Sequence, residues 1–141
     1  MKKVLTLTAL STLSCTLAFA PQADAYRATK TLNSVTAKAD LPYFSDFNNC
    51  GNYKAYSSTT RKDFKKLQHH VTFSATGGSV SFGGVGVSGS GTSPGYSKST
   101  KSKTYYSSGN VCGSGFIMYL GMSTTTHVEY SSRTYTATAK I

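Results

Sequence analysis

Apolar and hydroxyl-bearing residues alternate with a period of two from His70 onward. Residues 71–74 run apolar, polar, apolar, polar, and Val80 and Phe82 are again separated by a single serine. A period of two is typical of a strand that buries one face. Ser, Thr, Gly and Tyr dominate after the first 25 residues and Trp is absent, which favours strands and turns over helices.

Other segments extend the pattern. Residues 124–131 and 133–141 alternate in the same way, and a first strand is expected over 27–37. The continuous apolar run 115–121 is bounded by glycines and predicts a strand buried on both faces. One short helix is expected, over residues 60–68, with Thr60 as its cap. Six to eight short strands predict an all-β fold, a single small antiparallel β-sandwich or barrel-like domain.

The alternation changes phase at Gly83 and Gly84. Apolar residues lie on even positions before these glycines and on odd positions after them, as an inserted β-bulge in one bent strand would produce. Residues 88–95 hold three glycines and one proline and predict a flexible turn. Residues 71–107 are therefore predicted to form a long hairpin around that turn.

A membrane-inserting version of this hairpin is an alternative. Residues 79–88 have the length of a spanning β-strand, about 9–11 residues. The returning strand fits less well, because Lys98, Lys101 and Lys103 occupy both faces. One lysine would face lipid at a cost of about 2–4 kcal/mol near the midplane. Binding to a surface requires no such insertion.

The first 25 residues have the order of a cleavable secretory signal peptide. Lys2 and Lys3 precede a largely apolar run over 4–20, and Ala23 and Ala25 place small residues three before and one before a cut. The run is shorter and richer in hydroxyls than the roughly 20 apolar residues of a membrane anchor. We expect a signal peptide over 1–25 and one secreted, extracellular β-rich domain over 26–141.

Two cysteines, Cys50 and Cys112, remain after residue 25. In an oxidising compartment two cysteines of a small domain pair more often than they stay free. We therefore predict a Cys50–Cys112 disulfide that acts as a staple and not as a nucleophile or a metal site. A loop of this size restricts the unfolded chain by about 4 kcal/mol at most in a chain-entropy treatment.

Residues that could perform catalysis are few. A ribonuclease-like phosphodiesterase needs a base, an acid and a cation on the phosphate; the candidates, with neighbouring His69, are His70, His127, Glu129 and Arg133. Adjacent histidines at a strand start are usually solvated, and no histidine pair has the spacing of zinc ligands. We predict no metal site and no cofactor, and an enzyme is the less favoured alternative.

Positive charge is the strongest functional signal. Residues 26–141 hold 13 Lys and Arg against 4 Asp and Glu, a net charge of +9. The candidate anion-binding residues form two clusters with aromatic neighbours: Arg61, Lys62, Lys65 and Lys66, then Lys98, Lys101 and Lys103 with Tyr96, Tyr105 and Tyr106. Such patches indicate an anionic partner, unless they are only solvated faces that aid solubility.

The expected function is therefore that of a secreted cationic binding protein acting on an anionic envelope or membrane surface, in the manner of an antimicrobial or toxin-like factor. The expected partner is a cell-wall polymer or a membrane surface. A protein partner and nucleic acid stay open as partners. The alternatives are a secreted inhibitor of another protein and the phosphodiesterase.

Overall fold

The computed structural model describes residues 26–41, 50–82 and 85–141, and this part of the chain contains eight strands and no helix. The prediction of an all-β fold is confirmed, since one antiparallel sheet curls until it is nearly closed into a barrel. The strands are β1 (Tyr26–Leu32), β2 (Val35–Leu41), β3 (Cys50–Thr59), β4 (Phe64–Phe82), β5 (Val85–Thr100), β6 (Thr104–Ser114), β7 (Tyr119–Tyr130) and β8 (Arg133–Lys140).

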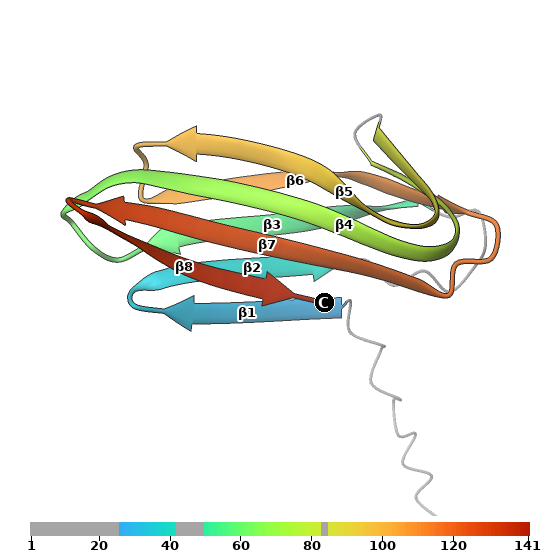
Figure 1. Cartoon of the computed structure of the whole chain (residues 1–141), viewed down its shortest axis with the longest axis horizontal. Coiled ribbons are helices and arrows are strands. Elements are labelled where there is room, and N and C mark those ends of the chain that lie inside the picture. Colours follow the sequence, from blue (N-terminus) through green and yellow to red (C-terminus); the bar gives the residue numbers. More distant parts are fainter. Residues whose placement is uncertain (1–25, 42–49, 83–84) are drawn as a thin grey trace, which may run out of the picture.

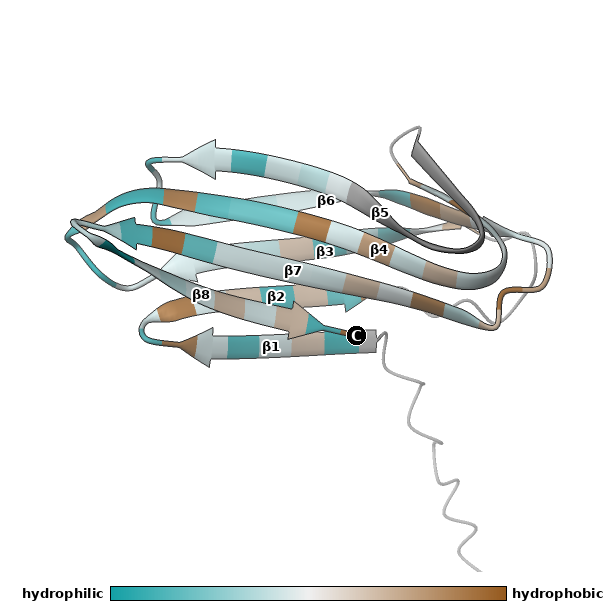
Figure 2. Ribbon diagram, viewed as in Figure 1, coloured by the Kyte–Doolittle hydropathy of each residue, from teal (hydrophilic) through white to brown (hydrophobic). Residues whose placement is uncertain are grey.

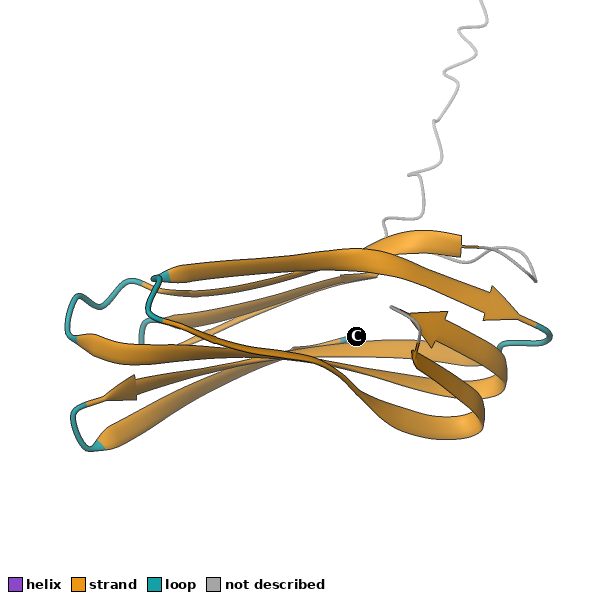
Figure 3. Ribbon diagram, turned by 90° about the horizontal axis from the view of Figure 1, so that it is seen from above, coloured by secondary structure: helices purple, strands orange, loops and turns teal. Residues whose placement is uncertain are grey.

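The strand order is β1-β2-β3-β6-β4-β7-β8, and β5 pairs with β4 beside this path. The first and last strands of the order, β1 and β8, lie against each other, which brings the two edges of the sheet together (Figure 1). Seen from above, the strands form two layers that face each other across the core (Figure 3).

The long strand β4 connects the two layers. Residues 64–76 of β4 pair with β7, whereas residues 79–82 pair with β6. Between these segments lie Gly77 and Gly78, both at positive φ, where the register with β5 also shifts. Glycine adopts this backbone conformation without the steric penalty of a Cβ, so the strand can bend there and change partners.

The core consists of the inward residues of the alternating strands. Small side chains come from β2, β3 and β8, for example Ala37, Ala55 and Ala137, and larger ones come from β4 and β7, for example Phe73 and Met122. Small residues of β2 and β3 leave room for the larger residues of β4 and β7 that face them, so the layers pack closely. The alternation of apolar and polar residues from which the strands were predicted therefore also separates buried from exposed side chains.

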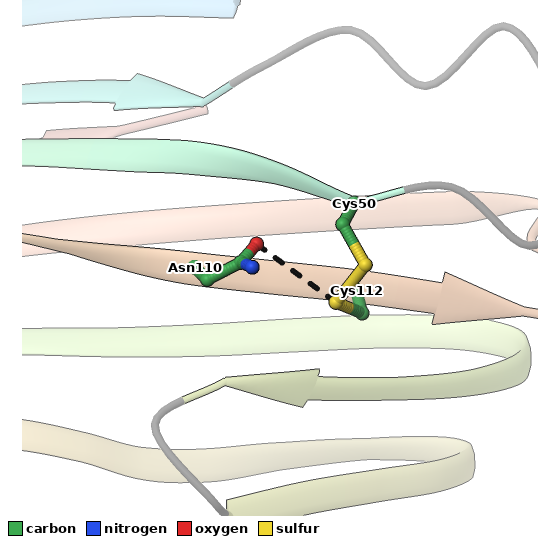
Figure 4. Close-up of a disulfide and its surroundings, with 3 residues drawn as sticks. All are labelled: Cys50, Asn110 and Cys112. Atoms are coloured by element: carbon green, nitrogen blue, oxygen red, sulfur yellow. Dashed lines mark hydrogen bonds between the residues drawn. A yellow bond between two sulfur atoms is a disulfide. The ribbon is translucent and has the colours of Figure 1, made fainter.

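Cys50 and Cys112 form the predicted disulfide, with a Cα–Cα distance of 4.0 Å. The two cysteines are directly opposite each other in the pairing of β3 with β6 (Figure 4). Oδ1 of Asn110 lies 3.8 Å from the Cys112 sulfur. The bond joins positions 62 residues apart in the sequence, at the start of β3 and near the end of β6.

The predicted helix over residues 60–68 is wrong. Residues 60–63 form a loop and β4 begins at Phe64. Asp63 binds the guanidinium of Arg61 instead of capping a helix. Leu67 and Val71 point into the core with one buried residue between them, so the period of two starts earlier than the sequence suggested.

The turn of the long hairpin was also misplaced. Residues 88–95 are part of β5 and pair with β4, and Phe82 pairs with Val85 in antiparallel register. The segments on either side of residues 83–84 therefore run antiparallel to each other, as β4 and β5. The predicted bulge site itself, Gly83 and Gly84, lies outside the described residues.

The apolar run 115–121 is not a strand buried on both faces. Residues 115–118 form the loop between β6 and β7, and exposed fractions are 65% for Phe116, 69% for Met118 and 47% for Tyr119. Gly121 and Met122, further along, are buried in β7. Of the two glycines that bound the run, Gly115 lies in this loop at a φ of +76°, whereas Gly121 lies within β7.

Candidate functional site: a basic end of the barrel

Four chain reversals lie together at one end of the barrel, on the left in Figure 1, at residues 33–34, 60–63, 101–103 and 131–132. In or next to three of these loops are six cationic side chains, which we call the basic end: Arg61, Lys62, Lys65, Lys101, Lys103 and Arg133. The two basic clusters of the sequence are thus brought to the same end of the molecule.

Hydrogen bonds tie these loops to one another. The backbone N–H of Thr59 donates to the carbonyl oxygen of Lys103 at 2.9 Å, which joins the loop after β3 to the loop before β6. The Lys65 ammonium donates to the Ser131 carbonyl oxygen at 3.1 Å, which joins the start of β4 to the turn before β8. The basic end is therefore a connected surface built by loops that are far apart in the sequence.

Arg61 is held in a fixed position within this surface. Its guanidinium lies over the ring of Tyr130, 4.4 Å from the ring centroid, and donates to both carboxylate oxygens of Asp63 at 3.2 and 3.3 Å. The hydrogen bond from Arg61 lowers the pKa of Asp63 and raises the pKa of Arg61. Both groups are therefore charged at neutral pH, and Asp63 offsets one positive charge.

The remaining cations at this end have no such partner. Outside the basic end, Asp40 binds Arg27 at 2.9 Å and Glu129 lies 3.8 Å from the ammonium of Lys66. Among the described residues, the basic-end cations without an ion pair are Lys62, Lys65, Lys101, Lys103 and Arg133. All five are exposed. Lys66 and Lys98 of the predicted clusters lie further along β4 and β5.

The three tyrosines predicted to contact a ligand lie in two places. The hydroxyls of Tyr96 and Tyr105 are 2.5 Å apart and their rings are stacked, which links β5 to β6. This hydrogen bond raises the pKa of Tyr105. Tyr106 points to the outer face of β6, opposite Tyr56 in the pairing with β3, and is 53% exposed. Tyr106 is thus the most exposed of the three.

Of the catalytic alternatives, the structure brings His70 and His127 together. Their ring centroids are 5.3 Å apart on the outer face of β4 and β7. Burial, and secondarily the charge of His70, lowers the pKa of His127. Glu129 follows on the same face but is paired with Lys66, and Arg133 belongs to the basic end. The four catalytic candidates are therefore divided between the outer face of β4 and β7 and the start of β8.

His69, the neighbour of His70, is fully buried, so the expectation of two solvated histidines is wrong for this residue. Its Nδ1 is 2.7 Å from the Ser57 hydroxyl oxygen and its Nε2 is 2.7 Å from the Ser107 hydroxyl oxygen. Burial, with a smaller effect of the His70 charge, lowers the pKa of His69 to about 4. His69 is therefore neutral at physiological pH.

This buried chain of polar groups spans the core. The Ser57 hydroxyl contacts the hydroxyl of Thr126 on β7, which in turn donates to the Thr36 carbonyl oxygen on β2 at 3.2 Å. The alternation of residues along β4 could have indicated that His69 points into the core, because His69 lies between two inward residues, Leu67 and Val71. The hydroxyl partners come from three other strands, which sequence spacing does not reveal.

Within residues 26–41, 50–82 and 85–141, no group of three or more His, Cys, Asp or Glu side chains is placed to hold a metal ion. No helix in this part of the chain is long and apolar enough to cross a membrane.

Comparison of the chain with protein-family models, with curated proteins and with solved structures gives no match.

Proposed function

We propose that the chain is a secreted, extracellular binding protein that attaches to an anionic cell-envelope or membrane surface through its basic end. The observation that carries the proposal is the convergence of two separate basic clusters, joined by the hydrogen bond from Thr59 to the carbonyl of Lys103. Secretion is supported by the signal-peptide order of residues 1–25 and by the Cys50–Cys112 disulfide.

The electrostatics of the basic end favour a repeated polyanion or a charged layer. Lys62, Lys101 and Lys103 are exposed and have no carboxylate partner among the described residues, so their fields add at one end of the molecule. Each lysine near an anionic membrane contributes about 1 kcal/mol of attraction, which is screened within a Debye length of about 8–10 Å at 0.10–0.15 M salt. Many weak contacts of this kind suit a surface with regularly spaced phosphates or carboxylates.

The test is co-sedimentation of the chain from Tyr26 to Ile141, which contains every described strand. Isolated cell walls, anionic liposomes and zwitterionic liposomes are compared at low and raised salt, with dye release recorded on the liposomes. We expect binding to anionic surfaces that weakens with salt. The triple variant Lys62→Glu, Lys101→Glu, Lys103→Glu should reduce the affinity at least about tenfold.

A matched control separates the basic end from net charge alone. The triple variant Lys38→Glu, Lys54→Glu, Lys140→Glu reverses the same number of exposed lysines, which lie on the strands β2, β3 and β8. We expect this control to lose much less affinity. Equal losses in the two variants would contradict a localised site, and binding to no surface would overturn the proposal and favour the inhibitor or phosphodiesterase alternatives. Loss of ribonuclease activity in His127→Ala would identify the latter.

A further inference from the structure

The outer face of β4 and β7 carries the pair His70 and His127, which the proposed anionic surface binding does not use. His70 is opposite Thr125 in the pairing of the two strands, and His127 is opposite Gln68, so the histidines are diagonal neighbours. Their rings are in contact although the two residues are far apart in the sequence. Spacing along the chain had therefore given no indication of a ligand pair.

The flanking strands hold both rings by the same atom. The Ser97 hydroxyl on β5 lies 2.8 Å from Nδ1 of His70, and the Thr136 hydroxyl on β8 lies 2.7 Å from Nδ1 of His127. Neither Nε2 atom has a hydrogen-bond partner among the described residues. Metal-binding histidines usually have this arrangement, in which one nitrogen is oriented by a hydrogen bond and the other is left for the metal.

The spacing of the rings leaves room for a shared tetrahedral ion. A zinc ion bound about 2.0–2.1 Å from each Nε2 lies about 3.2 Å from each ring centroid, and a tetrahedral angle then places the centroids about 5.2 Å apart. The observed centroid separation is 5.3 Å. We propose that His70 and His127 bind a zinc ion through their Nε2 atoms, with Ser97 and Thr136 orienting the rings.

The donor set defines what kind of zinc site this is. No third His, Cys, Asp or Glu of the described residues joins the two histidines. Two positions of a tetrahedral ion are then left to water or to an external ligand, so the site is open and exchangeable and does not resemble a closed structural site. In the zinc-bound form each Nδ1–H donates to its hydroxyl and each Nε2 lone pair goes to the metal.

The test is a titration of the chain from Tyr26 to Ile141, without a polyhistidine tag, with ZnCl₂ at pH 7.5. Imidazole nitrogen NMR follows all three histidines and calorimetry gives the stoichiometry. We expect one-to-one binding, reversed by EDTA, with shifts at Nε2 of His70 and His127. His69 serves as an internal control, because its ring is buried and both of its nitrogens are hydrogen-bonded to serine hydroxyls.

Variants distinguish this site from non-specific binding. His70→Gln and His127→Gln should each abolish the one-to-one binding. Ser97→Ala and Thr136→Ala should each weaken it about tenfold. Thr134→Ala, an exposed change on the neighbouring edge strand β8, should have no effect. Zinc shifts at neither ring, or an unchanged affinity in both glutamine variants, would overturn the proposal whatever the outcome of the surface-binding experiment.

Discussion

The most constrained single residue is His69, a titratable group without exposed surface in the core. Its hydroxyl partners Ser57 and Ser107 satisfy both ring nitrogens of the neutral form. A second proton would make the His69 ring positively charged. Among the described residues no carboxylate is hydrogen-bonded to this ring, so the charge would be costly in the low-dielectric interior. The fold therefore depends on the neutral ring.

Acid should destabilise the protein through His69. The unfolded chain binds a proton near pH 6.5 and the folded chain only near pH 4, so the unfolded state holds more protons between these values. The free energy of unfolding should keep its full value above pH 6.5 and should fall by about 3 kcal/mol as the pH drops to 4. Urea unfolding across this pH range, with EDTA present, measures this loss of unfolding free energy. His69→Gln should flatten this dependence; an equally steep dependence in the variant would place its origin elsewhere.

Two buried threonines of β7 form a second test at the residue scale. The Thr124 hydroxyl is buried without a hydrogen-bond partner among the described residues, whereas the Thr126 hydroxyl contacts Ser57 and the Thr36 carbonyl. Thr124→Val should be neutral or raise the free energy of unfolding by about 1 kcal/mol, and Thr126→Val should lower it by about 1–3 kcal/mol. Chemical denaturation compares them. A larger loss at Thr124 would reveal a polar contact for its hydroxyl.

At the scale of elements, backbone irregularities give β4 and β5 their shape. Opposite Thr72, between the pairs Val71–Tyr96 and Phe73–Ser93, β5 has one extra residue. Gly95 lies there at a φ of +60°, and a Cβ on it would be 1.9 Å from the Val71 carbonyl oxygen. Only glycine fits this bulge.

Gly95→Ala should therefore lower the free energy of unfolding by more than about 2 kcal/mol, since it adds a backbone collision to the cost of a left-handed conformation. Gly115→Ala is the matched control. Gly115 also has a positive φ, +76°, but the closest atom to its added Cβ is 3.5 Å away. The control should lose only about 1–2 kcal/mol. Similar losses at both sites would show that the close approach to Val71 relaxes easily.

How far the sequence predicts this fold depends on the element. The alternation correctly placed Val71, Phe73, Val80 and Phe82 in the core, because one buried sheet face imposes that period directly. Turns were harder to predict from the sequence. The hairpin turn was expected over residues 88–95, because glycine and proline are typical of turns, whereas this segment belongs to β5 and pairs with β4.

For the candidate site, the sequence indicated which cations to consider, whereas their arrangement came only from the structure. Two clusters are visible in the sequence, and loop-to-loop contacts such as that between Thr59 and Lys103 bring most of their residues to one end. The His70–His127 pair and the partners of His69 were likewise hidden, because cross-strand neighbours depend on strand order. Local pattern determines which way a side chain points, whereas topology determines what it meets.

At the scale of the whole molecule, the described loops at the two ends of the barrel differ in chemistry. The loop between β6 and β7, which carries exposed Phe116 and Met118, lies at the opposite end from the basic loops and is coloured as hydrophobic in Figure 2. The long strands between them keep the two ends apart (Figure 1). The described loops are therefore basic at one end of the molecule and carry exposed apolar side chains at the other.

This polarity fixes an orientation for any bound layer. A molecule that docks with its lysines toward an anionic surface holds the loop between β6 and β7 away from that surface, and this loop contains the exposed Phe116 and Met118. A dense coat of such molecules would turn a wettable, negatively charged envelope into one that presents apolar side chains to the medium. Cells covered in this way would become less wettable and would tend to adhere to one another and to oily or solid interfaces, as a result of how the barrel is aligned and without any chemical change to the envelope.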